Sequence, residues 1–387
     1  MSEYIAKRMS GNDLEQELLK LIADYNKKSK RKLLVYTVAI SKHMLETSLS
    51  MDDYYIIADL LRDADDGTLD VYLETPGGSG EAAEEIVNFL RSKFKEVNFI
   101  ISGEAKSAGT LMALSGNEIT MTKTGSLGPI DAQVVIGRGN VSAHDYMQWV
   151  IAKQDEADKN QMLNPFDATM VAQISPGELN GVNNALEFAH DLVVKWLPIY
   201  KFKNWDVTET KKTKVTTAMK EKRARQIALD LSDHSRWRSH GRSLKISDLE
   251  SIGLKINALE DTPELCDIIN HIQVVSRMLF TTTNTYKIYA FDGVKIFASA
   301  AVAGAPNMPQ QQAPDNAQLE VGCTNCGKLH KIYAKLVPDN TIDENLQRQG
   351  WAPFPSDSKL VCDCGFETDL TGVKNDIETG SGRKVVQ

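Results

Sequence analysis

The stretch LDVYLETPGGSGEAAEEI, residues 69–86, contains a strand pattern, a glycine turn and the start of a helix. Residues 69–74 suit a buried strand, whereas residues 80–94 place apolar side chains at helical spacing. The same alternation continues on both sides, with a strand in LLVYTVAI, a helix at 52–64, strands at 97–102 and 118–122, and a helix from 107. Strands that alternate with helices of ten or more residues predict parallel βαβ units with right-handed crossovers. We therefore expect an α/β protein with a parallel sheet.

Further helices and one hairpin are predicted outside this repeat. Helical spacing of apolar residues indicates helices near 12–25, from Ser142, over 178–200 and over 263–281. The basic stretch NKKSKRK, which precedes the first strand, is interpreted as a solvated connection. Asp292-Gly293 lies between YKIYAF and VKIFASA, and this pattern predicts a β-hairpin.

Composition argues against two broad classes of protein. The chain has 387 residues and a formal net charge of −8, spread over both signs, which does not suit a whole-protein surface for nucleic acid or acidic membranes. No apolar run approaches the roughly 20 residues that cross a bilayer. The N-terminus is charged and amphipathic, whereas a secretory signal is apolar. We expect a cytoplasmic protein without a membrane role.

The pattern of composition divides the chain into five parts. Residues 1–32 hold the N-terminal helix and its basic connection, and residues 33–302 form the α/β domain. Residues 303–318, rich in Ala, Pro and Gln, predict a flexible linker. Residues 319–372 form a compact unit with four cysteines, and residues 373–387 are expected to be a disordered tail.

Three loops that follow strands contain small residues together with candidate catalytic side chains. They are Thr75–Gly78, the segment at Ser107, and TGSLGPIDAQ at 124–133. Because parallel strands end at the same edge of a sheet, the three loops are expected to lie together there. Taken alone, Ser107 is typical of a helix N-cap and PGG of a turn. Lys106, next to the serine, and Lys123 are expected to be solvated.

In this order, the motifs resemble a known family. TPGG, SAGT, GSLGPIDAQ and the late segment SRWRSHGRSLKISDLESIGL are together similar to the Clp-fold serine peptidases, a superfamily that includes Clp-type protease subunits, signal peptide peptidase A and crotonases. Within it, the chain most resembles the SDH-family Clp-fold serine proteinases, over about residues 33–258. The resemblance implies a crotonase/Clp-like core and a serine endopeptidase that acts on polypeptides as a homo-oligomer.

The resemblance also implies roles for particular residues. Ser107 would be the nucleophile, at a helix N-terminus where the helix dipole favours negative charge. The backbone amides of Gly78 and Ala108 would form the oxyanion hole. Substrate would lie extended beside the loop of Gly77 and Gly78, as an added strand.

The general base remains open at this stage. Clp-type subunits carry a histidine after the nucleophile helix, where this chain has GPIDAQ with Asp131. His240 ranks first, because neutral histidine is the ordinary base at neutral pH, although it can equally satisfy loop hydrogen bonds. Lys153 ranks second, since a lysine base needs its pKa lowered by burial, and His144 ranks third. Asp131 either orients the base or caps its loop.

Two close cysteine pairs in the C-terminal unit predict a metal site. Each pair lies on a short turn followed by glycine: Cys323 and Cys326, then Cys362 and Cys364. Four thiolates in this spacing favour a structural Zn²⁺ ion in a zinc-ribbon-like fold, over free thiols or a disulfide. His330 is not needed as a ligand, and Cys266 is expected in a helix core. Trp351 and Phe354 form either the small core of this unit or a contact surface.

Two other functions compete with the peptidase. A catalytically silent scaffold would use the ribbon-like unit and the basic segment 201–225 to bind nucleic acid or a protein partner. For that segment, a charge-rich loop followed by a solvated helix face is favoured over a nucleic-acid patch. A crotonase-like enzyme would bind acyl thioesters at the same oxyanion pocket, but it has no need of Ser107.

Overall fold

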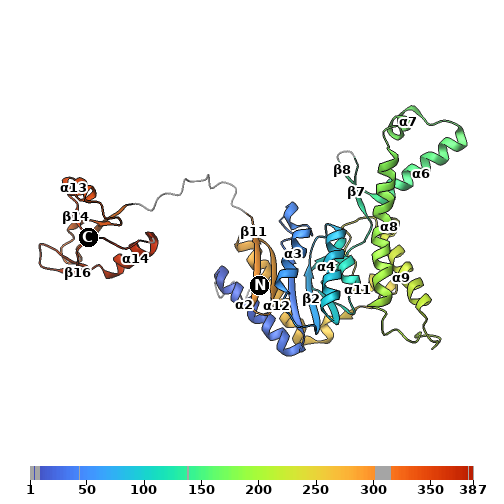
Figure 1. Cartoon of the computed structure of the whole chain (residues 1–387), viewed down its shortest axis with the longest axis horizontal. Helices are drawn as coiled ribbons and strands as arrows, with labels where there is room; N and C mark the ends of the chain where they lie inside the picture. The colour runs from blue at the N-terminus through green and yellow to red at the C-terminus, as the bar shows by residue number, and fades with distance from the viewer. Residues whose placement is uncertain are drawn as a thin grey trace. The chain divides into compact units, whose positions relative to one another are not determined.

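A computed structural model of the chain describes residue 4 and residues 9–42, 44–136, 139–300, 315–381 and 383–386. The chain forms two compact units, Met1–Ala301 and Val302–Gln387 (Figure 1). Most of the expected linker, residues 303–314, lies outside the described residues. Among the described helices, none combines the length and the apolar character that a bilayer crossing requires.

The first unit is built on a seven-stranded sheet of order β11-β10-β1-β2-β3-β5-β9. Its strands are β1 (Lys32–Val38), β2 (Thr68–Glu74), β3 (Glu96–Ile101), β5 (Ile119–Met121), β9 (Asn257–Ala258), β10 (Thr285–Phe291) and β11 (Val294–Ser299). The five strands from β1 to β9 pair in parallel, which confirms the βαβ prediction. β10 and β11 form the predicted hairpin, and β10 joins the edge of the sheet antiparallel to β1.

Helices cover both faces of this sheet. Leu33 and Val35 of β1 pack in one apolar cluster with α2 (Gly11–Ser29) and α12 (Pro263–Thr282). The alternate residues, Leu34 and Tyr36, pack in a second cluster on the opposite face. That cluster includes residues of α3 (Met51–Leu60), α4 (Gly80–Lys93), α5 (Ala108–Leu114), α8 (Pro176–Ile199) and α9 (Thr217–Ser232). A strand buried on both faces explains why LLVYTVAI is continuously apolar.

The predicted helices agree with the observed ones to within a few residues. The first helix of the chain, α2, ends four residues later than predicted. α2 begins after Ser10, which forms a capping box with Asp13, and it ends at Lys30 in the left-handed conformation. NKKS therefore belongs to the helix, and the basic connection is shorter than predicted. Two lysines in the last helical turn interact favourably with the helix dipole.

Smaller elements surround the predicted loops and extend from the sheet. They are η1 (Leu45–Thr47), β4 (Glu104–Ala105), β6 (Ser126–Leu127), β7 (Gln133–Ile136), β8 (Gly139–Ser142), α6 (Ala143–Asn160), α7 (Pro165–Val171), α10 (His234–Trp237), α11 (Ile246–Ser251) and η2 (Leu259–Asp261). β4 and β6 pair in parallel, and β7 pairs with β8 in a hairpin that the sequence patterns did not predict. Figure 1 shows α6, α7 and one end of α8 projecting away from the sheet. We call this projection, residues 143–185, the arm.

The second unit is small and has little core. Its elements are β12 (Asn316–Gly322), β13 (Leu329–Lys335), α13 (Asn340–Arg348), β14 (Ala352–Pro353), β15 (Lys359–Val361), β16 (Glu367–Asp369) and α14 (Thr371–Ser381). β12, β13 and β14 form one sheet, and β15 pairs with β16. Phe354 lies in the core of this unit, the first of the two alternatives, while Trp351 is half-buried and lies under the ammonium of Lys331.

The expectation of a disordered tail over 373–387 is wrong for the part that the structure describes. Residues 371–381 form α14, and Val373, Ile377 and Val385 pack against the core of the unit. The amide of Val386 donates to the carbonyl of Lys335 at 2.8 Å. These three apolar residues, spaced four and eight positions apart, are too few in a short polar sequence to give a recognisable helical pattern.

Candidate active site and cysteine cluster

Ser107 is held in a conformation that is unusual for a serine. It lies between β4 and α5 with φ 49° and ψ −115°, and its side chain makes no capping hydrogen bond to the helix. Non-glycine residues at positive φ cost on the order of 1–3 kcal/mol and persist where the surrounding structure enforces them. A strained turn between a strand and a helix is one way in which enzymes expose a nucleophilic hydroxyl. The structure therefore removes the interpretation of Ser107 as a side-chain N-cap.

The glycine loop after β2 lies directly against this serine. Gly77 has φ 99°, and a Cβ atom added there would lie 2.8 Å from both the Lys106 carbonyl oxygen and Ser107 Cβ. Gly78 has φ 147°, and a Cβ there would lie 2.4 Å from the backbone of Leu49. Both positions therefore require glycine for conformation and for space.

Two backbone amides near Ser107 are left as donors. The amide of Gly77 donates to Thr75 Oγ1 at 3.2 Å, and the amide of Ser79 donates to Leu49 at 2.9 Å. Within the described residues, the amides of Gly78 and Ala108 are paired with no acceptor. Ala108 is the first residue of α5, where a helix leaves its amides unpaired.

Packing around Thr110 joins the three predicted loops. Its Oγ1 lies 2.8 Å from the carbonyl oxygen of Ala105 and 3.1 Å from that of Gly128, and it accepts the Gly128 amide at 2.9 Å. A Cβ added to Gly109 would lie 2.4 Å from Cγ2 of Thr75. The loops at 75–78, 105–110 and 126–128 are therefore locked together at one edge of the sheet, as the sequence predicted.

Asp131 receives two histidines, one of which the sequence analysis missed. The carboxylate is 2% exposed and lies 2.8 Å from His240 Nδ1 and 3.1 Å from His234 Nδ1. Burial alone would raise the pKa of Asp131, but the hydrogen bonds and charges of His240 and His234 outweigh burial and lower it. His234 Nε2 also contacts Asp145 at 3.3 Å. Both ring nitrogens of His234 are thus occupied by carboxylates, whereas His240 pairs only through Nδ1 within the part of the chain that the structure describes.

The His240 segment is bonded to the serine turn. Leu244 and Leu127 exchange backbone hydrogen bonds at 2.9 and 3.1 Å, and Lys106 Nζ donates to the carbonyl of Arg242 at 3.0 Å. Among the described residues, no hydrogen bond joins His240 directly to Ser107. Catalytic hydrogen bonds are often long without substrate, so this geometry is compatible with a base. A histidine six residues before His240, in DHSRWRSH, was the available signal for His234.

Residues 45–187 match the family of ClpP-like SDH-type serine proteinases. The resemblance read from the sequence motifs is thereby confirmed over this stretch, which contains the serine turn, the glycine loop and Asp131. It ends before His234 and His240. Any role of those two histidines therefore rests on the observed geometry and not on the family match.

Curated relatives match part of the chain. An uncharacterized protein of Methanocaldococcus jannaschii is 33% identical over 120 residues, which span 31% of this chain and 38% of that protein. An ATP-dependent Clp protease proteolytic subunit of Streptococcus thermophilus is 37% identical over 100 residues, 24% of this chain and 45% of that subunit. The chain thus spans less than half of the length of these two relatives.

Two solved structures of a membrane-bound stomatin-specific protease, 1510-N, are also similar. They have TM-scores of 0.31 and 0.30 and sequence identities of 13% and 15%. They cover 57% and 56% of this chain, and 79% and 70% of their own chains. Scores this low do not establish a shared fold on their own.

Lys153, ranked second as a base, does not meet the chemical requirement. Its ammonium pairs with Asp167 at 2.7 Å and with Glu156 at 2.8 Å, on the arm. Hydrogen bonds to these two carboxylates raise the pKa of Lys153, whereas a lysine base needs it lowered. His144 is partly exposed and lies 3.5 Å from Asp145.

The expectation for Lys106 was wrong, while that for Lys123 was right. Lys123 is exposed, but Lys106 is only 6% exposed and has its ammonium inside the protein. Its position directly before Ser107 gave no sequence signal of burial, because burial here comes from distant residues of the 242–243 segment.

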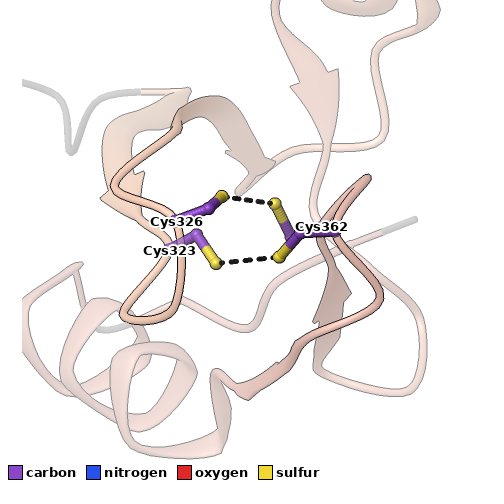
Figure 2. Close-up of side chains that lie close together, drawn as sticks. Cys323, Cys326 and Cys362 are labelled. Atoms are coloured by element: carbon purple, nitrogen blue, oxygen red, sulfur yellow. Dashed lines mark hydrogen bonds between the residues drawn. The ribbon is translucent and has the colours of Figure 1, made fainter.

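The second unit brings the four paired cysteines together. The sulfur atoms of Cys323, Cys326, Cys362 and Cys364 all lie within 4.8 Å of one another (Figure 2). Cys323 and Cys364 are 3.7 Å apart, and Cys326 and Cys362 are 3.6 Å apart, so neither contact is a disulfide. Cys266, by contrast, is a buried residue of α12, as predicted.

The cysteine cluster fits a tetrahedral metal ion by its donors and its spacing. Zn–S bonds of about 2.3 Å in a tetrahedron separate the sulfurs by about 3.8 Å, close to the observed contacts. Both turns are hydrogen-bonded and end in glycine at positive φ, Gly327 with φ 75° and Gly365 with φ 84°. His330 is not among the four ligands.

Proposed function

We propose that this protein is a serine peptidase with Ser107 as nucleophile. The observation that carries the proposal is the strained, uncapped Ser107, set between the two free amides of Gly78 and Ala108. His240 is the general base, because its Nε2 is the ring nitrogen that Asp131 does not occupy. Asp131 orients that ring.

The arrangement supports acyl transfer in two steps. His240 Nε2 takes the proton of Ser107 Oγ as the oxygen attacks the scissile carbonyl, and Asp131 stabilises the imidazolium that forms. The amides of Gly78 and Ala108 donate to the developing oxyanion, each worth roughly 3 kcal/mol in comparable enzymes. His240 then gives the proton to the leaving amine, and a water molecule hydrolyses the acyl-Ser107 ester with the same base.

The proposed substrate is a polypeptide held in an extended conformation. Gly77 accepts the Leu49 amide at 2.8 Å on one side, so the loop is already part of a strand-like pairing. Beside this pairing, the free amide of Gly78 can donate to the scissile carbonyl of a bound extended peptide.

We also propose that the protein acts as a homo-oligomer. Large apolar side chains are exposed on β7 and the arm: Val135 (74%), Ile151 (44%), Met162 (70%), Phe166 (72%) and Met170 (44%). Exposed apolar side chains of this kind are typically buried at a subunit interface. Light scattering on the full chain tests this, and a monomer at working concentrations would contradict it.

The C-terminal unit is proposed to be a zinc-ribbon-like domain. Zn²⁺ would be held by the four cysteine sulfurs and would stabilise the fold, because four protein ligands leave no open coordination position for chemistry. Metal analysis of freshly reduced protein is expected to find one zinc per chain.

A fluorophosphonate probe tests the peptidase proposal directly, because it labels only an activated serine. Wild type is expected to be labelled, whereas Ser107→Ala and His240→Gln are not. Ser92→Ala, an exposed serine on α4, is the matched control and keeps full labelling. Absent labelling of the wild type, together with a salt-sensitive shift of DNA or RNA, would instead favour the binding scaffold.

A further inference from the structure

Lys106 occupies a position that the proposed mechanism does not use. Its Nζ donates to Ser243 Oγ at 2.8 Å, to the carbonyl of Arg242 at 3.0 Å and to that of Leu127 at 3.3 Å. An ammonium has three N–H donors and no acceptor, so these three contacts use all of them. None is left for the hydroxyl of Ser107, and Lys106 is therefore not placed to act as its base.

The main chain of Lys106 belongs to the serine turn. Its amide donates to the carbonyl of Thr75 at 3.0 Å, and its carbonyl accepts the amide of Gly109 at 2.8 Å. The side chain then runs along Gly128, where an added Cβ would lie 2.9 Å from Lys106 Cδ. Lys106 thus joins the serine turn to Arg242 and Ser243, which lie two and three positions after His240.

We propose that Lys106 is a positioning residue whose ammonium holds the His240 segment against the Ser107 turn. This inference rests on the proposed function. Asp131 fixes the His240 ring through Nδ1, but it does not fix the distance from that ring to Ser107. The Lys106 ammonium supplies that restraint, because it bonds Arg242 and Ser243 from the residue next to the nucleophile.

The charge of the ammonium makes the restraint sensitive to pH. Burial lowers the pKa of Lys106 to about 8; the negative charge of Glu104 opposes this effect, and the positive charge of Lys245 adds to it. The segment 127–128, which also packs against the side chain, carries no charge, and Arg242 contacts the ammonium through its carbonyl oxygen. Loss of the proton removes one donor and the charge, so the restraint is intact below pH 8 and weakens as the pH rises through that value.

The second-order rate of fluorophosphonate labelling, measured from pH 6 to 10 on the full chain, tests this role. We expect the wild-type rate to fall as the pH rises through about 8. Lys106→Met is expected to label at least tenfold more slowly at pH 7 and to show no fall near pH 8. Lys245→Met is the matched control: Nζ of Lys245 also donates to main-chain carbonyls, those of Thr124 and Gly125, but it does not contact the serine turn.

The outcomes separate this inference from the proposed function. Lys245→Met should keep the wild-type rate, with its alkaline fall unchanged or at higher pH. A Lys106→Met rate within twofold of wild type would overturn the role of Lys106. A wild-type labelling rate that keeps rising to pH 9.5 would also overturn the role of Lys106. This second result does not depend on whether the variant folds. Failure of the peptidase proposal itself would be seen as equal labelling of wild type and Ser107→Ala.

Discussion

The serine turn and the cysteine cluster are both built on short glycine turns, but different forces hold them. The serine turn is packed against Thr75, Gly77 and Gly128 and rests on the large apolar cluster of the first unit. Among its described residues, the second unit has a core cluster of four buried residues, with seven partly buried apolar residues packed against it: Ile332, Ala334, Phe354 and Leu370 are the buried ones. A core that small rarely stabilises a fold without a staple. Packing therefore shapes the first site, whereas the second has four sulfur donors for the metal ion that we propose completes it.

Removal of the metal is expected to have the largest effect, and to affect the stability of the second unit alone. Structural zinc sites contribute roughly 10–16 kcal/mol in small peptides at neutral pH, more than a four-residue core supplies. Chelation under reducing conditions should therefore unfold the second unit while leaving the first unit and serine labelling intact. Calorimetry should show one of two transitions lost.

Cysteine variants sharpen this test. Cys362→Ser should lose the same transition and the bound zinc, because it removes one of the four sulfur ligands. Cys266→Ser, in the core of α12, is the control that removes a sulfur but keeps the zinc. If chelation leaves both transitions unchanged, the second unit folds by packing alone and the contrast between the sites fails.

The next largest effect is expected from Asp131→Asn. The asparagine amide can donate to His240 Nδ1 where the carboxylate accepts, which reverses the tautomer and puts the proton on the nitrogen that must receive one. A comparable change lowers the rate roughly 10⁴-fold, or about 5.4 kcal/mol. Labelling kinetics measure this, and thermal unfolding checks the fold.

Asp145→Asn is the matched control for this change. Asp145 is 57% exposed and contacts His234, so its loss should reduce labelling less than tenfold. Equal rates for Asp131→Asn and wild type would show that Asp131 only caps its loop, the alternative that the sequence left open.

A smaller effect, on stability, is expected from Gly109→Ala. The added methyl would lie 2.4 Å from Cγ2 of Thr75, in a region packed on all sides. Overpacking of this kind costs about 1–3 kcal/mol, and it should lower the unfolding temperature of the first unit. Gly67→Ala, where an added Cβ meets nothing within 4 Å, should change stability by less than about 0.5 kcal/mol. Identical stabilities would show that the loops are less tightly joined than the contacts imply.

Local patterns predicted those parts of the fold and site that depend on neighbouring residues. The order of strands and helices, the convergence of the three loops and the gathering of the cysteines follow from periodicity and spacing. The burial of Lys106 could not be predicted in this way, because it depends on Arg242 and Ser243, more than 130 positions away. The same holds for His234, whose partner Asp131 lies 103 residues earlier in the chain.

The antiparallel edge of the sheet shows the same limit at the level of topology. Asp292-Gly293 predicted the hairpin of β10 and β11, but no local signal places β10 beside β1, whose paired residues lie 249 to 257 positions earlier (Val38 with Lys287, Leu34 with Phe291). The prediction of a disordered tail was wrong for a different reason. Val373 and Ile377 are too few to give a strong helical pattern, and their partners in the core of the second unit are defined only after folding.

The smallest expected effect distinguishes the two histidines that share Asp131. His234 has carboxylates at both ring nitrogens, 3.1 Å from Asp131 and 3.3 Å from Asp145, so no nitrogen is free for the proton of Ser107. His234→Gln should therefore slow labelling less than tenfold, about 1.4 kcal/mol or less, by weakening the hold on Asp131. His240→Gln should abolish labelling, because it removes the base itself.

Labelling rates of the two variants, measured beside wild type, decide the assignment. His271→Gln, a partly exposed histidine on α12 that lies 3.8 Å from Asp267, is the matched control and should label as wild type does. The opposite ranking, with His234→Gln silent and His240→Gln active, would transfer the role of base to His234. The ring would then have to give up its contact with Asp145 in the folded enzyme, and Asp145→Asn would speed labelling where the present assignment predicts a small loss.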